Sequence, residues 1–221
     1  EIDRQYSQDY DISSFQLMKL AARRVVEVIL TRYGDTKRAQ VFCGSGNNAG
    51  DGFLVAAGLA DRGWLVQVAL VGDPEKLTEA SRDALAVCQN SQAIVEAFEG
   101  AVLDRAILVD ALLGLGVHGQ IRSAYRSAII AINASSSAVV AVDLPSGLQP
   151  DSGEVGAVCV RAAITVTFLA LKIGLFSQDG PDYAGEIILA DLGLPDILLA
   201  KHADKALRIL EAPRLPARQN K

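Results

Sequence analysis

The stretch that decides the fold of this chain is Gly44-Ser45-Gly46-Asn47-Asn48-Ala49-Gly50-Asp51-Gly52. A short apolar run ends at Cys43 just before it, and apolar residues with helical spacing begin at Phe53 just after it. A glycine-rich turn from a strand into a helix leaves backbone N–H groups uncovered at the positive end of the helix, where an anion binds favourably. Two asparagines and an aspartate add polar groups that a plain turn does not need. The stretch therefore predicts a ligand-binding loop; the competing interpretation is a tight turn in which Asp51 stabilises the helix start.

Short β-rich runs alternate with helical stretches on both sides of this loop. The first helix is expected to begin at Ser13 or Ser14, either of which can cap it. Strands are expected at 39–43, 65–71, 93–98, 106–110, 138–143, 164–168 and 186–191, and further helices at 51–62, 78–89 and 123–135. Near-continuous apolar strands separated by helices are typical of a parallel sheet covered on both faces. The sequence therefore predicts an α/β fold.

Composition and charge narrow the class of protein. Half of the 221 residues are apolar, which is enough for one substantial core, and we expect a single domain over residues 1–212 followed by a linker or tail over 213–221. A net charge of −5 without a basic run in the domain disfavours nucleic acid as a partner, and no apolar run reaches membrane-spanning length. Three widely spaced cysteines among apolar residues indicate a reducing compartment, so we expect a cytoplasmic protein.

Polar residues follow several of the predicted strands at the point where each strand ends. The first strand runs into the glycine-rich loop, and later ones run into Asp110, Asp143 and, a few residues further on, Lys172. In an open parallel sheet, ligands bind at the carboxyl ends of the strands. We therefore expect these groups to converge on one edge and form a site.

The glycine-rich loop also fits the pattern G-x-G-x-x-A, a weak fingerprint of dinucleotide-binding folds, at Gly44, Gly46 and Ala49. Two features argue against that use. Asp51 is expected beside the helix start, where its charge would repel a pyrophosphate. The acidic residue expected after the second strand is poorly matched, because Asp73 is followed at once by a proline.

Each candidate residue has a structural alternative. Asp110 is as well suited to cap the next helix as to serve in a site. Asp143 is followed by a proline turn rather than a helix, which favours an acid–base role. Ser146 can bond its own turn, and Lys172 can lay its stem on apolar surface with its head in water.

Oxygen donors, not histidines or cysteines, dominate the predicted site. Asn48, Asp110 and Ser146 together suit a hard cation. His118 and His202, the two histidines of the chain, have no partner at zinc-ligand spacing. A transition-metal site is therefore disfavoured.

Three motifs together resemble the YjeF N-terminal domain, whose enzymatic members are the NAD(P)HX epimerases. They are Asn47-Asn48-Ala49-Gly50-Asp51-Gly52, Asp110-Ala111-Leu112-Leu113-Gly114 and Asp143-Leu144-Pro145-Ser146-Gly147-Leu148. Further matches are Ile2-Asp3-Arg4, Leu17-Met18, Asp151-Ser152-Gly153, Thr165-Val166-Thr167-Phe168, Lys172-Ile173-Gly174-Leu175 and Gly185. The resemblance extends from Ile2 to about Pro195.

The resemblance implies a Rossmann-like three-layer α/β/α sandwich with a mostly parallel central sheet, and interconversion of the R and S epimers of hydrated NADH or NADPH. It implies a potassium ion at Asn48, Asp110 and Ser146, an acid–base role for Asp143, and charge stabilisation by Lys172. The implied substrate contacts are Asn47, Asn48, Ala49, Gly50, Asp51, Gly114, Leu115, Gly116, Val117, His118, Gly119, Gln120 and Asp143.

The sequence departs from the family pattern at Ala49, where glycine is more usual, and at Leu115 and His118. Residues 214–218 resemble the linker to an ADP-dependent dehydratase domain in bifunctional bacterial members. We also expect a homo-oligomer, in the form of a dimer.

Two functions of other classes compete with the epimerase. A non-catalytic dinucleotide-binding or scaffold module of the same fold occurs in related proteins. The retained Asp110, Asp143 and Lys172 weigh against it. The second alternative is an ordinary NAD-dependent dehydrogenase, and the G-x-G-x-x-A match is the only feature that supports it.

Overall fold

The computed structural model describes Tyr6, residues 9–114 and residues 121–195. Within these ranges, seven strands form one sheet in the order β3-β2-β1-β4-β5-β6-β7, and every pairing is parallel. The strands are β1 (Arg38–Cys43), β2 (Leu65–Leu70), β3 (Ile94–Ala97), β4 (Ile107–Ala111), β5 (Val139–Val142), β6 (Ile164–Phe168) and β7 (Glu186–Ala190). All seven predicted strands are confirmed, and so is the α/β fold with a parallel sheet.

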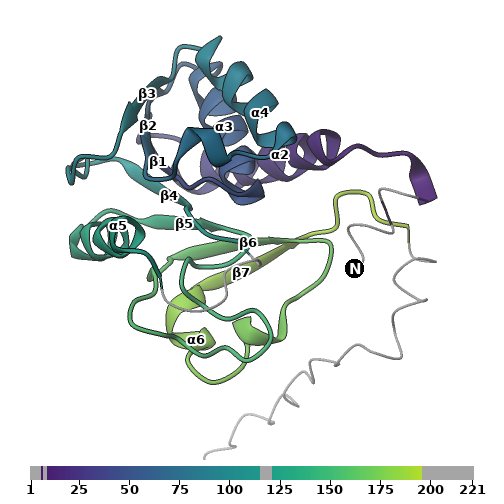
Figure 1. Cartoon of the computed structure of the whole chain (residues 1–221), viewed down its shortest axis with the longest axis vertical. Helices are drawn as coiled ribbons and strands as arrows, with labels where there is room; N and C mark the ends of the chain where they lie inside the picture. Colours follow the sequence, from purple (N-terminus) through teal and green to yellow (C-terminus); the bar gives the residue numbers. More distant parts are fainter. Residues whose placement is uncertain (1–5, 7–8, 115–120, 196–221) are drawn as a thin grey trace, which may run out of the picture.

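Helices cover both faces of this sheet. Figure 1 shows α2, α3 and α4 on one face and α5 and α6 on the other. Their bounds are α2 (Ser14–Tyr33), α3 (Asn47–Ala60), α4 (Glu79–Gln89), α5 (Ser123–Ala134) and α6 (Gly180–Ala184), with 3₁₀ turns η1 (Pro74–Lys76) and η2 (Ile173–Leu175). Because side chains of a strand alternate between faces, Val41 packs in the core beneath α2, α3 and α4, whereas Phe42 packs with Ile129 of α5. The result is a three-layer sandwich.

Helix α2 begins where the sequence predicts. Ser13 is its N-cap: its hydroxyl accepts a hydrogen bond from the Gln16 backbone N–H, and the Gln16 side chain accepts one from the Ser13 N–H. This reciprocal capping box satisfies two N–H groups at the helix start. The buried face of the helix joins the larger of the apolar cores.

Helix α3 begins at Asn47, four residues earlier than the predicted start at Asp51, with Gly46 as N-cap. Glycine is a poor helix former, by about 1 kcal/mol relative to alanine, which is why the pattern predicted a longer loop. Packing accounts for the glycines instead. A Cβ on Gly50 would lie 2.7 Å from Met18 Sδ of α2, and one on Gly52 would lie 2.5 Å from Ala111 Cβ of β4. The helix is therefore held closely between α2 and the sheet.

Two further observations on the described residues concern membrane-spanning helices and cysteines. None of their helices combines the length and the apolar character that crossing a bilayer requires. Cys43, Cys88 and Cys159 are all free and buried, as their apolar sequence contexts predict.

Candidate functional site

Four neighbouring strands, β1, β4, β5 and β6, bring the predicted polar groups to one edge of the sheet. Asn48 follows β1, Asp110 is the fourth residue of β4, Asp143 follows β5 directly, and Lys172 follows β6. The chain order of the strands reverses between β1 and β4, and ligands of open α/β sheets bind outside the carboxyl ends of the strands at such a point. The hydrogen bonds at this edge form two groups, one that includes Asn48, Asp110 and Ser146 and one that includes Asp143 and Lys172.

Asp110 is fully buried near the end of β4. One carboxylate oxygen, Oδ2, accepts from the Ser146 N–H at 2.7 Å, and the other accepts from the Ser146 hydroxyl at 2.6 Å and the Leu112 N–H at 3.2 Å. Burial raises the pKa of Asp110 to about 6, although these hydrogen bonds act in the opposite direction. Arg122 occupies the N-cap position of helix α5, without a side-chain capping hydrogen bond, so the interpretation of Asp110 as the cap of that helix is wrong.

Asn48 completes a cluster with Asp110 and Ser146. Its side-chain amide donates to the Leu113 carbonyl oxygen at 2.9 Å, and the Leu113 N–H donates to the Ser146 hydroxyl at 3.0 Å. The loops after β1, β4 and β5 are thus joined. Ser146 therefore bonds other loops rather than only its own turn.

The carbonyl oxygen of the Asn48 side chain is buried and has no hydrogen-bond partner among the described residues. Such a group costs about 1–3 kcal/mol unless something satisfies it. A donor set of amide carbonyl, carboxylate and hydroxyl oxygens suits a hard cation. The residues present therefore fit the predicted cation, because the orphaned oxygen of Asn48 lies in the same cluster as Asp110.

Asp143 is held in an unusual backbone conformation, with φ at 68°. Few residues other than glycine adopt positive φ, and aspartate and asparagine do so more readily than most. The conformation turns the chain sharply at the end of β5, so that the carboxylate faces Lys172. Local strain of this kind concentrates at functional sites.

Lys172 donates to the Oδ1 atom of Asp143 at 2.5 Å, to the Thr167 hydroxyl at 3.0 Å and to the Phe168 carbonyl at 2.8 Å. Its side chain is 16% exposed and that of Asp143 13% exposed. The interpretation of Lys172 as a surface lysine with its head in water is therefore wrong. Thr167, which lies in the matched run Thr165-Val166-Thr167-Phe168, was not among the predicted site residues.

The remaining predicted substrate contacts are placed differently from one another. Asn47 is exposed at the start of α3 and accepts a hydrogen bond from the Thr78 hydroxyl at 2.8 Å. Ala49 and Gly50 are buried inside the helix packing, and Asp51 is half-buried one turn into α3. The first turn of α3 holds no acidic residue, so the argument that Asp51 would repel a pyrophosphate at the helix start is wrong.

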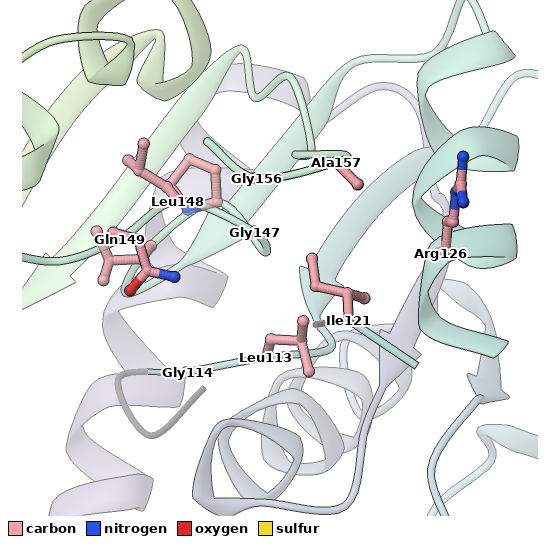
Figure 2. Close-up of a pocket in the computed structure, with 11 residues that line it drawn as sticks. Leu113, Gly114, Ile121, Arg126, Gly147, Leu148, Gln149, Gly156 and Ala157 are labelled. Carbon is pink, nitrogen blue, oxygen red and sulfur yellow. The ribbon is translucent and has the colours of Figure 1, made fainter. Parts of the chain in front are cut away.

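A cavity of about 300 Å³ lies between the loops after β4 and β5, and Pro145 and Gly147, the chain neighbours of Ser146, line it. Figure 2 shows Leu113 and Gly114 on one side of it, Gly147, Leu148 and Gln149 on another, and Arg126 of α5 across from them. Of the predicted substrate contacts, Gly114 lines this cavity, whereas residues 115–120 lie outside the described ranges. The described residues of the walls are mostly apolar or glycine, and Arg126 carries the one charged group among them.

Known proteins resemble this chain in sequence over most of its length. The family model described as YjeF-related protein N-terminus matches residues 14–174. The NAD(P)H-hydrate epimerase of Limosilactobacillus reuteri is 41% identical over 185 residues, which cover 82% of this chain and 87% of that protein. The bifunctional NAD(P)H-hydrate repair enzyme Nnr of Coxiella burnetii is 38% identical over 186 residues. That match covers 84% of this chain, which spans only 38% of the length of the relative.

A solved structure shows the same fold at lower sequence identity. The crystal structure of yeast ynu0, YNL200c, has a TM-score of 0.78 and 18% identity, with 90% of this chain and 88% of that chain covered. The two proteins therefore share a fold although their sequences have diverged. By the family match over residues 14–174, and by its identity to the relatives named above, this chain belongs to the YjeF-related protein N-terminus family.

Proposed function

We propose that this chain is an isomerase, an NAD(P)H-hydrate epimerase that interconverts the R and S forms of hydrated NADH and NADPH. The observation that carries the proposal is the Asp143–Lys172 pair at the strand ends, beside the buried cluster of Asn48, Asp110 and Ser146. The 41% identity to the L. reuteri epimerase over most of both chains supports it.

The chemistry needs a group that gives and takes one proton at the hydrated ring carbon. Asp143 gives its proton to the hydroxyl of the substrate, the C–O bond breaks, and the electron pair leaves with water, which leaves a cation on the ring. Water then adds to the opposite face of the ring and returns one proton to Asp143. The cycle consumes no net proton, and a single carboxyl group serves as acid and then as base.

We further propose a potassium ion held by Asn48, Asp110 and Ser146. The orphaned Asn48 oxygen and the buried Asp110 carboxylate support this assignment. When bound, potassium supplies a fixed positive charge that neutralises Asp110 and satisfies the free oxygen of Asn48.

We assign the substrate to the crevice between the loops after β1, β4 and β5. The proposed contacts are Asn47 to Asp51, Gly114 to Gln120 and Asp143. The cavity lined by Gly114 and Arg126 supports this location on the side of the loops after β4 and β5, because an arginine is suited to a phosphorylated ligand. The homodimer and the fused dehydratase domain stay predictions; light scattering on the purified chain measures the first.

Conversion of purified R-NADHX to the S form is the test of the proposed function. We expect the wild-type chain to catalyse it, followed by chromatographic separation of the epimers, for NADHX and NADPHX in parallel. Binding of either compound without epimerisation would instead favour the non-catalytic module. Hydride transfer to a carbonyl substrate would favour the dehydrogenase.

Potassium is expected to stabilise the folded chain as well as to raise the rate. A ligand present at about 100 times its Kd raises the melting temperature of a domain of this size by about 5 °C. The measurement is thermal unfolding in potassium chloride and in choline chloride at equal ionic strength. Equal melting temperatures and equal rates in the two salts would remove the potassium site from the proposal.

A further inference from the structure

Thr167 of β6 lies between the two charged groups of the site. Its side chain is fully buried, its oxygen is 3.1 Å from Asp143 Oδ1, and it is 3.0 Å from Lys172 Nζ. The family resemblance implies no role for this residue. Its position makes it the one hydroxyl among the described residues that contacts both Asp143 and Lys172.

The direction of each hydrogen bond follows from which groups carry hydrogens. An ammonium can only donate, so the Thr167 oxygen must accept from Lys172. The single hydroxyl hydrogen of Thr167 is then left to donate to Asp143 Oδ1. All three hydrogens of Lys172 are also used, on Asp143, Thr167 and the Phe168 carbonyl.

The two carboxylate oxygens of Asp143 consequently differ in their hydrogen bonds. Oδ1 accepts from Lys172, from Thr167 and from the Phe168 N–H at 3.3 Å. Oδ2 accepts no hydrogen bond from the residues that the structure describes. A proton on Asp143 therefore belongs on Oδ2, because Oδ1 already faces three donors.

We infer that Thr167 is a positioning residue, which with Lys172 holds Oδ1 so that Oδ2 is the oxygen that exchanges the proton with the substrate. This inference rests on the proposed epimerase function. It also changes the role of Lys172: with its hydrogens fully used on the protein, Lys172 acts on the substrate through Asp143 rather than by direct contact.

The chain offers a matched control on the same strand. Thr165 lies two residues before Thr167, on the same face, and is equally buried. Its hydroxyl donates to the Ala184 carbonyl at 2.6 Å, away from Asp143 and Lys172. A threonine-to-valine change at either position removes a buried hydroxyl at nearly constant volume.

The test compares Thr167→Val, Thr167→Ser and Thr165→Val in the epimerase assay. We expect Thr167→Val to lower kcat about 10- to 100-fold with KM within about twofold, because a hydrogen bond to a charged group is lost. Thr167→Ser restores most of kcat because it keeps the hydroxyl. Thr165→Val lowers the melting temperature but leaves kcat within about twofold. Equal kcat for the two valine variants, or a change confined to KM, would overturn the inference.

Crystal structures of the two valine variants separate this inference from the proposed function. In Thr167→Val we expect the Asp143 carboxylate to turn away from its wild-type position, whereas in Thr165→Val it stays. An Asp143 side chain unmoved in Thr167→Val would overturn the positioning role even with an active enzyme. An inactive wild type would defeat the epimerase assignment alone, and the structures would still decide whether Thr167 orients Asp143.

Discussion

Replacing Asp143 with asparagine is expected to lower kcat for R-to-S conversion about 10³-fold, within the range that acid–base groups contribute. Asparagine has the same shape but exchanges no proton at this position. It also tolerates the positive φ of Asp143, so the turn after β5 is kept. The measurement is a time course of epimer interconversion, read by chromatography, at saturating substrate.

The control for this variant is its fold. We expect Asp143→Asn to keep the circular dichroism spectrum of wild type, with a moderate fall in melting temperature because Lys172 loses its ionic partner. Substrate binding, measured by calorimetry, should stay within a few fold. A variant that retains more than about a third of wild-type kcat would show that Asp143 is not the proton-exchanging group.

Replacing Gly44 with alanine is expected to destabilise the chain by about 3 kcal/mol, through overpacking at the base of the site. A Cβ there would lie 1.9 Å from the Leu112 carbonyl oxygen and 3.1 Å from Tyr125 Cε1. The carbonyl belongs to the backbone of the loop that carries Leu113, so relief requires the loops after β1 and β4 to separate. Urea unfolding of the variant and of wild type measures the difference.

Gly46 in the same motif supplies the matched comparison. A Cβ on Gly46 would have no described atom within 4 Å, and its φ of −95° suits any residue. Gly46→Ala is therefore expected to change the free energy of unfolding by less than about 1 kcal/mol, with a weaker N-cap set against a less flexible unfolded chain. Similar losses for the two variants would contradict the view that packing, rather than conformational freedom, requires glycine at position 44.

The strands were predictable because the central ones are buried on both faces. Their sequences are therefore apolar runs between turn residues. The start of α3 was not, since local helix propensity counts against Gly50 and Gly52. Only the approach of Met18 from α2 and of Ala111 from β4 explains why those glycines lie inside a helix. That information comes from elements distant in the sequence.

The site was predictable at the level of which residues converge, and less so at the level of what each does. Strand ends of a parallel sheet must meet at one edge, which brought Asp110 and Asp143 together in the prediction. The role of Thr167 depends on the turn at Asp143. The local sequence does not predict the positive φ of that residue. The burial of Lys172 depends in the same way on how the chain leaves β6.

The place of β1 and β4 in the sheet has a consequence for how the site responds to heat. Both strands are hydrogen-bonded on two sides, and nearly all their residues are buried. Amide hydrogens of such strands exchange with solvent only when the whole domain opens, while edge strands such as β3 open locally. Asp110 belongs to β4, and Asn48 belongs to α3, which packs against β1. The anchoring of this site should therefore persist up to global unfolding, and activity and secondary structure should vanish together on heating.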